Sequence, residues 1–268
     1  MNLASTVSKK NRALLAELVR TDFKLRYQGS ILGYTWSLLR PLLLFLILYV
    51  VFVKFLRIGE GVPHFPVYLL LGIVIWNFFH EMTVQSLTSI VGRGDLIRKI
   101  RIPRWIIILS SSISALINLL LNLIVVIFFM VINKVELLDT IVWLPLILLE
   151  VYIFAVGLSL FLSAAYVKYR DVNYIWEVIL QAGFYITPIL YPLTLITNLT
   201  LQKLIMLNPM AQAIQDARYV SVTHETVVGY QVFDGGWYML IPFFIVTASF
   251  IGGLFYFKSQ AKYFAENI

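Results

Sequence analysis

The sequence predicts an all-α integral membrane protein, and two observations support this: the composition and the length of the apolar runs. Hydrophobic residues make up 60% of the 268 positions, charged residues only 13%, and the mean hydropathy is +0.86. Soluble domains carry about 25% charged residues. Several apolar runs reach the roughly 20 residues that a helix needs to cross a bilayer core of about 30 Å. The chain also has no cysteine, which excludes disulfides and thiolate metal sites.

The N-terminal segment is charged and lacks the apolar core and small-residue cleavage site of a signal peptide. Within it, Lys9–Tyr27 has the periodicity of an amphipathic helix, with Leu14, Leu15 and Leu18 on one side and basic residues opposite. Such a helix lies in the headgroup plane of a membrane. We therefore expect residues 1–30 to form a cytoplasmic interface helix and residues 31–268 to form a single transmembrane domain.

Six segments are apolar and long enough to span a bilayer. The first is the weakest, because Arg40 interrupts it beside Pro41, close enough to one end for its side chain to reach the headgroups. The six segments are Leu32–Val53, Phe65–Ile90, Trp105–Asn133, Thr140–Val167, Val172–Leu190 and Trp237–Phe257.

The distribution of Lys and Arg predicts the orientation. Sixteen lie in the N-terminal arm and in the segments after the second, fourth and sixth spans, whereas the alternate loops hold five. Because Lys and Arg collect on the cytoplasmic side, we expect a multi-pass protein with both termini in the cytoplasm. The net charge of +7 then reflects membrane topology, and no nucleic-acid partner is expected.

The densest cluster of charge lies between the second and third spans, in Val91–Trp105. Apolar residues alternate with the charges there, although a loop in contact with solvent alone would not need them. Pro103 ends any short helix before the next span. Two interpretations remain open on this pattern: an amphipathic helix that docks into a soluble partner, and a positive-inside loop that only fixes topology. The residues concerned are Arg93, Asp95, Leu96, Ile97, Arg98, Lys99, Arg101, Pro103 and Arg104.

A second short connection, Lys168–Asp171, joins the fourth and fifth spans. Asp171 is placed to cap the helix that starts at Val172. Alternatively, Arg170 and Asp171 contact a partner, and both roles remain open.

The segment after the fifth span is too apolar for a solvated loop and too broken for a seventh span. Pro188 and Pro192 bar a straight helix at its start. Asn208-Pro209 then supplies an N-cap and a proline at the first helical position, which predicts a helix to about Val222. Broken backbone at membrane depth survives only where protein or a cavity covers it. We therefore predict an outer re-entrant helical hairpin between the fifth and sixth spans.

Catalytic and nucleotide-binding motifs are not found. No glycine is followed by lysine, so there is no P-loop. His80-Glu81 and His224-Glu225 begin like a zinc-protease motif, but valine stands where each second histidine is needed. No nucleophile and base pair up, so an enzyme is not expected.

Three carboxylates fall inside or near the spans, at Glu81, Glu150 and Glu177. Charge inside a membrane is costly, so each is a candidate functional residue. The alternative is a carboxyl group hydrogen-bonded between helices or placed near an interface, and the interface is favoured for Glu177, six residues after Asp171.

Six stretches along nearly the whole chain jointly carry a family resemblance: Tyr27–Pro41, Gly72–Phe79, Asp95–Arg104, Tyr169–Asp171, Phe184–Pro192 and Asn208–Met210. With these stretches the chain resembles the permease subunit of ATP-binding-cassette polysaccharide exporters, the family that moves O-antigen, capsule and teichoic-acid-type glycans. The lead into the third stretch, Gly92-Arg93-Gly94, is more basic than is usual in that family.

The resemblance implies a transporter of two permease copies and two copies of a separate ABC ATPase. The ATPase would bind ATP and Mg, so no cofactor or metal is expected in this chain. A lipid-linked glycan would be moved out across the bacterial cytoplasmic membrane. The loop at Asp95–Arg104 would be the coupling helix that docks on the ATPase, the N-terminal helix would also touch it, and the broken helices after Pro192 would form the outer gate.

Aromatic side chains, 15% of the chain, stack on sugar rings, but interfacial belts and helix packing use them as well. The candidates for the translocation path or gate are Phe45, Tyr49, Phe52, Phe184, Tyr185, Pro188, Tyr191 and Pro192. Two other functions remain open: an ABC permease for drugs or small lipids, and a proton-coupled carrier or membrane glycosyl-transfer enzyme that uses Glu81 and Glu150.

Overall fold

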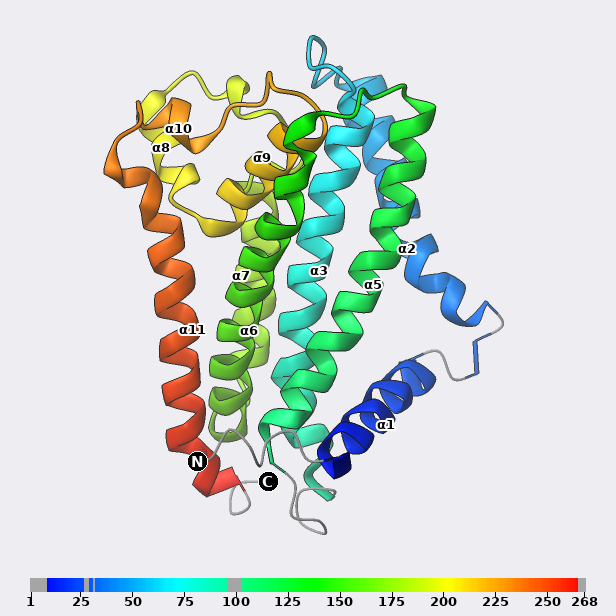
Figure 1. Cartoon of the computed structure of the whole chain (residues 1–268), viewed down its shortest axis with the longest axis vertical. Coiled ribbons are helices and arrows are strands. Elements are labelled where there is room, and N and C mark those ends of the chain that lie inside the picture. Colours follow the sequence, from blue (N-terminus) through cyan, green and yellow to red (C-terminus); the bar gives the residue numbers. More distant parts are fainter. Residues whose placement is uncertain (1–8, 27–28, 31, 96–102, 265–268) are drawn as a thin grey trace.

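The computed structural model describes residues 9–26, 29–30, 32–95 and 103–264, and these residues form helices and turns without a strand. The long helices lie side by side along one direction (Figure 1). We call the end that holds α1 and the last turn of α11 the base, and the opposite end the top. The principal elements are α1 (Lys9–Arg26), α2 (Trp36–Leu48), η3 (Tyr49–Phe55), α3 (Phe65–Gly92), α5 (Trp105–Ile132), η4 (Asp139–Trp143), α6 (Leu144–Lys168), α7 (Val172–Ile186), α8 (Leu199–Met206), α9 (Pro209–Ser221), α10 (Gly229–Val232), η6 (Trp237–Leu240), α11 (Ile241–Gln260) and η7 (Ala261–Tyr263).

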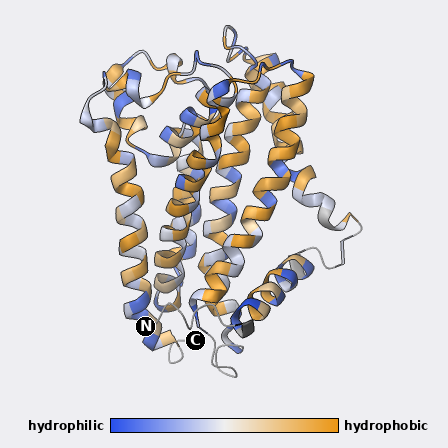
Figure 2. Ribbon diagram, viewed as in Figure 1, coloured by the Kyte–Doolittle hydropathy of each residue, from blue (hydrophilic) through white to orange (hydrophobic). Residues whose placement is uncertain are grey.

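Five helical stretches are long and apolar enough to cross a membrane, so the chain is a multi-pass membrane protein. Hydrophobic residues dominate the middle of these helices, and hydrophilic ones gather at the ends and on α1 (Figure 2). The five stretches are Trp36–Phe55, Phe65–Gly92, Trp105–Ile132, Asp139–Lys168 and Trp237–Tyr263.

The predicted fifth span is shorter than expected. It forms α7, whose 15 residues end at Ile186, followed by Thr187 in an extended conformation. At 1.5 Å per residue this helix is roughly 22 Å long, less than a bilayer core. The two prolines that follow explain why it stops. Even so, α7 carries the chain from the base back toward the top (Figure 1).

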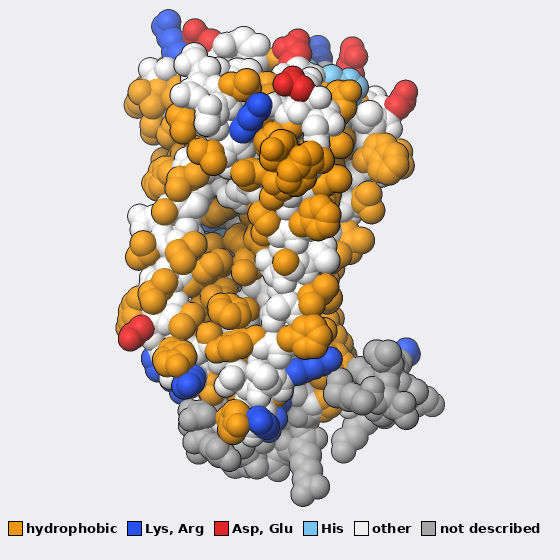
Figure 3. All heavy atoms as spheres, turned by 90° about the vertical axis from the view of Figure 1, so that its left-hand side faces the viewer, with side chains coloured by type: hydrophobic (Ala, Val, Ile, Leu, Met, Phe, Trp, Pro, Cys, Tyr) orange, Lys and Arg blue, Asp and Glu red, His pale blue; other side chains and the backbone are white. Residues whose placement is uncertain are grey.

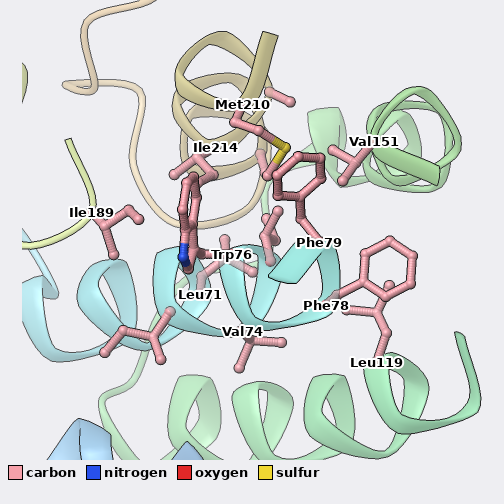
Figure 4. Packing of buried hydrophobic residues seen from close by; sticks show 14 of the residues in the cluster. Leu71, Val74, Trp76, Phe78, Phe79, Leu119, Val151, Ile189, Met210 and Ile214 are labelled. Atoms are coloured by element: carbon pink, nitrogen blue, oxygen red, sulfur yellow. The ribbon is translucent and has the colours of Figure 1, made fainter. Parts of the chain in front are cut away.

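Helix α3 is the centre of the bundle. In the most apolar stretch of α3, 78% of the residues are buried, whereas in that of the first span only 6% are. In Figure 4, Trp76 and Phe79 point from α3 toward Met210 and Ile214 on α9, while Phe78 points the other way, toward Leu119 on α5. Helix α9 is itself covered, because 11 of its 13 residues are buried.

Helices α6 and α11 pack at unusually close range. A Cβ atom added at Gly157 would lie 2.6 Å from the Cα of Phe250, and one added at Gly253 would collide with the carbonyl of Gly157. Small residues allow such close approach between helices in a membrane.

Two sequence predictions about short segments are confirmed. Leu18 of α1 is buried while Arg12 and Arg20 are exposed, as expected for an amphipathic helix. Asn208 caps α9 by accepting a hydrogen bond from the amide of Met210 at 2.9 Å.

Candidate functional site

A cavity with a volume of about 1010 Å³ lies between α2, α3, α5 and α7. Several of its lining side chains on α2 and α7 are exposed, among them Arg40, Glu177 and Gln181. The cavity therefore opens to the surface between α2 and α7. Figure 3, seen from the α11 side, shows a hollowed and largely hydrophobic middle band between charged ends.

The character of the lining changes from the base to the top. Helices α5 and α7 rise from the base and α3 descends to it, whereas α2 begins well above the base (Figure 1). Glu177 lies in the second turn of α7, in the lower part of the cavity. Arg40 lies one turn after Ser37 on α2, whose carbonyl binds Asn122, and so stands in the upper part. Amide side chains occupy the middle, and aromatic ones the upper part. The amides are Asn77, Gln85, Asn118, Asn122 and Gln181, and the aromatics include Trp76, Phe184 and Tyr185.

Hydrogen bonds hold the polar part of the lining in place. Asn118 of α5 donates to Glu81 of α3 at 2.6 Å. Asn122, one turn further along α5, donates to the carbonyl of Ser37 on α2 at 3.3 Å. These two amides join α5 to α3 and to α2, so hydrogen bonds hold the polar part of the wall in position.

Close packing forms the aromatic part of the wall. The ring centroids of Trp76 and Phe184 lie 6.1 Å apart. Gly183 leaves room for the indole of Trp76, since a Cβ atom added at Gly183 would lie 2.8 Å from it. Two turns nearer the base, the indole of Trp176 donates to Thr83 at 3.1 Å and ties α7 to α3.

Only part of the aromatic set expected on a path lines this cavity. Phe184 and Tyr185 do. Phe45 is only 5% exposed and packs against Phe129 on α5, with ring centroids 5.4 Å apart. Tyr49 and Phe52 pack against the same hydrophobic core, so in the second half of α2 the cavity is lined by Leu44 and Ile47 and not by these aromatic residues.

The break after α7 is stabilised by side chains that satisfy its free carbonyls. The hydroxyl of Tyr191 donates to the carbonyl of Ile186 at 2.9 Å. The guanidinium of Arg218 donates to the carbonyls of Pro188 and Ile189. Pro188 and Pro192 are buried, so protein covers the irregular backbone.

Arg218 corrects an expectation from the sequence, where it counted as a cation of an outer loop. Its side chain is fully buried. It donates to the carbonyl of Tyr68 at 2.9 Å and lies 3.7 Å above the ring of that tyrosine. A Cβ atom at Gly72 would collide with its guanidinium. One signal was available: Arg218 falls on the same helical face as Ala211 and Ile214, seven and four residues before it.

The candidate coupling residues fall into two groups. Leu96, Ile97, Arg98, Lys99 and Arg101 lie outside the described residues, and Asp95 is exposed beside them. Arg93, in contrast, makes an ion pair with Asp22 of α1 and donates to Ser110 of α5 at 3.0 Å.

Arg104 plays a similar role at the other end of the loop. It donates to the carbonyl of Ala261 and lies 5.8 Å from the ring of Phe264, while Pro103 before it is half-buried. The two ends of the basic loop are thus tied to α1 and to the C-terminal turn η7.

The turn between α6 and α7 exposes Arg170 and Asp171. The predicted side-chain cap is not formed: Asp171 stands at the N-cap position with φ −66° and ψ −17°, and its carboxylate accepts no capping hydrogen bond. N-cap residues normally have an extended conformation, whereas Asp171 has a helical one. Arg170 lies 5.1 Å from the ring of Tyr166.

The intramembrane acids lie in separate places. Glu81 and Glu177 line the cavity. Glu150 of α6 lies instead beside Gln212 and Asp216 of α9, where Gln212 donates to Asp216. Glu81 and Glu150 therefore do not share one site. In the described part of the chain, no three His, Asp or Glu side chains gather as a metal site.

The chain is similar to known proteins over most of its length. An O-antigen export system permease protein, RfbA, of Klebsiella pneumoniae is 30% identical over 238 residues, which are 82% of this chain and 91% of that protein. A second RfbA of that organism is 29% identical over 94% of both chains. RfbA of Myxococcus xanthus is 29% identical over 80% of this chain and 82% of its own. The ABC-2 type transporter family matches residues 13–222, from α1 to the end of α9 and with all four walls of the cavity. The chain therefore belongs to the ABC-2 type transporter family.

Proposed function

We propose that this chain is the membrane subunit of an exporter that moves a lipid-linked polysaccharide out across the bacterial cytoplasmic membrane. The cavity between α2 and α7 carries the proposal. Its amides and carboxylates suit sugar hydroxyls, and its upper aromatic rings suit sugar faces. The names of the three RfbA relatives support polysaccharide as the cargo.

The proposed membrane topology has six crossings, with α7 and the buried extended segment after it as the fifth. The base is then cytoplasmic, α1 lies along that interface, and the segment from α8 to α9 forms a re-entrant hairpin that serves as the outer gate. The burial of α9 and the satisfied carbonyls after α7 support a position within the membrane.

A second copy of the chain would complete the conduit. Asn173, Glu177 and Gln181 recur every four residues along α7, and the last two are exposed. Polar and charged side chains that face lipid are costly. A homodimer that places this stripe against a shared aqueous path removes the cost.

Energy would come from two copies of a separate ABC ATPase, which bind ATP and Mg. We assign its docking surface to Arg98, Lys99 and Arg101, together with Asp95, Arg170 and Asp171. The Asp22–Arg93 ion pair would pass a movement of that loop on to α1.

The native chain has no cysteine, so single cysteines can test the path. We expect a bulky maleimide on Gln181→Cys to stop export of surface polysaccharide in cells. The same label on Ile127→Cys, on an exposed apolar position of α5, should leave export intact. If both labelled variants export equally well, the cavity is not the path.

If deletion of the gene changes no surface polysaccharide, the proposal that the cargo is a glycan is wrong, and a permease for drugs or small lipids becomes the better hypothesis.

A further inference from the structure

The charges of the cavity are few and, on balance, negative. Its lining includes one permanent cation, Arg40, and two carboxylates, Glu81 and Glu177. His80 is the other titratable side chain there that can become positive, and a histidine is ordinarily mostly neutral at pH 7. The sum over the described residues of the lining is therefore −1.

The positions of these charges matter as much as their sum. Arg40 lies one turn after Ser37, whose carbonyl binds Asn122, so it stands at the upper side of the amide band and above Glu81. A chain that moves toward the top therefore meets the two carboxylates before the arginine. Glu81 lies within that band, held by Asn118 at 2.6 Å, and Glu177 borders it from α7. Between low-dielectric walls, charges act on each other far more strongly than in bulk water. A single arginine matches one anionic group per chain, but not one in every repeat.

The top of the molecule offers no compensating positive surface. Blue and red side chains are mixed there in Figure 3. In the described part of the top, the cations outside the buried Arg218 are Lys54, Arg57, Lys134 and Lys203, and the acids are Glu60, Glu136, Asp139, Glu225 and Asp234.

Hydrogen-bond chemistry points the same way. A carboxylate only accepts hydrogen bonds, and sugar hydroxyls can donate to it. A phosphodiester or a sugar carboxylate presents further acceptor oxygens, which repel Glu81 and Glu177. The five amides offer both donors and acceptors, as a polymer of hydroxyl groups requires.

Resting on the proposed export function, we infer that the cargo of this cavity is a polymer of uncharged sugars. A polyanion such as a glycerol-phosphate or ribitol-phosphate chain, or an acidic polysaccharide, is the class that the lining excludes.

Charged thiol reagents test the electrostatic part in the assembled transporter. In Gln181→Cys we expect a cationic methanethiosulfonate (trimethylammonium) to react at least fivefold faster than the anionic sulfonate analogue, relative to the same ratio at Val142→Cys, an exposed site at the top. Glu177→Gln, alone and with Glu81→Gln, should reduce this preference, while Glu136→Gln, an exposed acid outside the cavity, should not. An equal or faster reaction of the anionic reagent at position 181 overturns the inference.

Chemical analysis of the cargo tests the inference in cells. We expect deletion of the gene to remove one surface polymer and to make it accumulate inside, with no phosphate or carboxylate in its repeating unit. A lost polymer with a charged repeating unit overturns the neutral-cargo inference and leaves export standing. If no polymer is lost, the proposed export function fails, and this inference fails with it.

Discussion

At the scale of single residues, Arg218 has the most demanding environment in the described structure. A buried guanidinium needs partners for its donors, and here backbone carbonyls of α3 and of the break after α7 supply them, together with Gln215. The arginine thus fastens α9 to two other elements without a carboxylate.

We expect Arg218→Ala to destabilise the protein by about 3 kcal/mol or more, because it leaves several buried carbonyls without donors. Thermal unfolding in detergent would show this as a lower Tm. Arg57→Ala, at an exposed arginine of the top, is the control and should leave Tm unchanged. Equal Tm values for the two variants would show that the buried contacts are not needed.

Asp216 gives a pH-dependent prediction. Burial raises the pKa of Asp216 from 3.8 to about 6, and the hydrogen bond from Gln212 opposes this only in part. The folded protein then keeps a proton that the unfolded chain loses, so stability falls as pH rises from about 4 to 6 and stays lower above. Asp216→Asn should therefore gain about 2–3 kcal/mol at pH 7.5 and nothing near pH 4. Unfolding of this variant and of Glu136→Gln at both pH values checks the difference.

At the scale of elements, the ends of helices could be predicted from the sequence, but their faces could not. The apolar runs and the prolines place every long helix within a few residues. A membrane helix such as α2 is apolar all round, however, so its pattern does not reveal that Phe45 packs inward while Ile47 borders a cavity. Arg218 was misplaced for the same reason, since the burial of α9 depends on α3.

Two adjacent glycines of α11 allow a matched test of helix packing. Gly253 touches the backbone of α6, whereas an added Cβ at Gly252 meets nothing within 4 Å. Gly253→Ala should separate the helices and lower Tm by several degrees, a cost of about 1–3 kcal/mol. Gly252→Ala should be neutral or slightly stabilising, because alanine favours a helix. Similar effects at both sites would mean that the close approach of α6 and α11 contributes little.

At the scale of the whole molecule, the cavity exists only because four helices bring distant residues together. Arg40, Glu81, Asn118 and Glu177 stand on α2, α3, α5 and α7. In the sequence each is an isolated polar residue in or near an apolar run, and the two glutamates could be read singly as candidates. Their common site follows from tertiary packing, which hydropathy does not encode.

The basic loop should combine a docking surface with an internal fastening, and two sets of variants separate these roles. We expect replacement of Arg98, Lys99 and Arg101 by Glu to leave the protein inserted but to abolish association with its ATPase, because like charges would then face acidic groups of the partner. Arg93→Ala should instead keep the ATPase bound and uncouple it, since the ion pair from the end of α3 to Asp22 of α1 and the hydrogen bond to Ser110 of α5 are lost. Exchange of the pair, Asp22→Arg with Arg93→Asp, restores an opposite-charge contact and should recover part of the transport-coupled ATP hydrolysis.

Co-purification of the ATPase measures docking, and ATP hydrolysis together with export measures coupling. If the triple variant still binds its ATPase and exports normally, the docking assignment is wrong; if the exchanged pair is no better than Arg93→Ala, the ion pair does not transmit the movement.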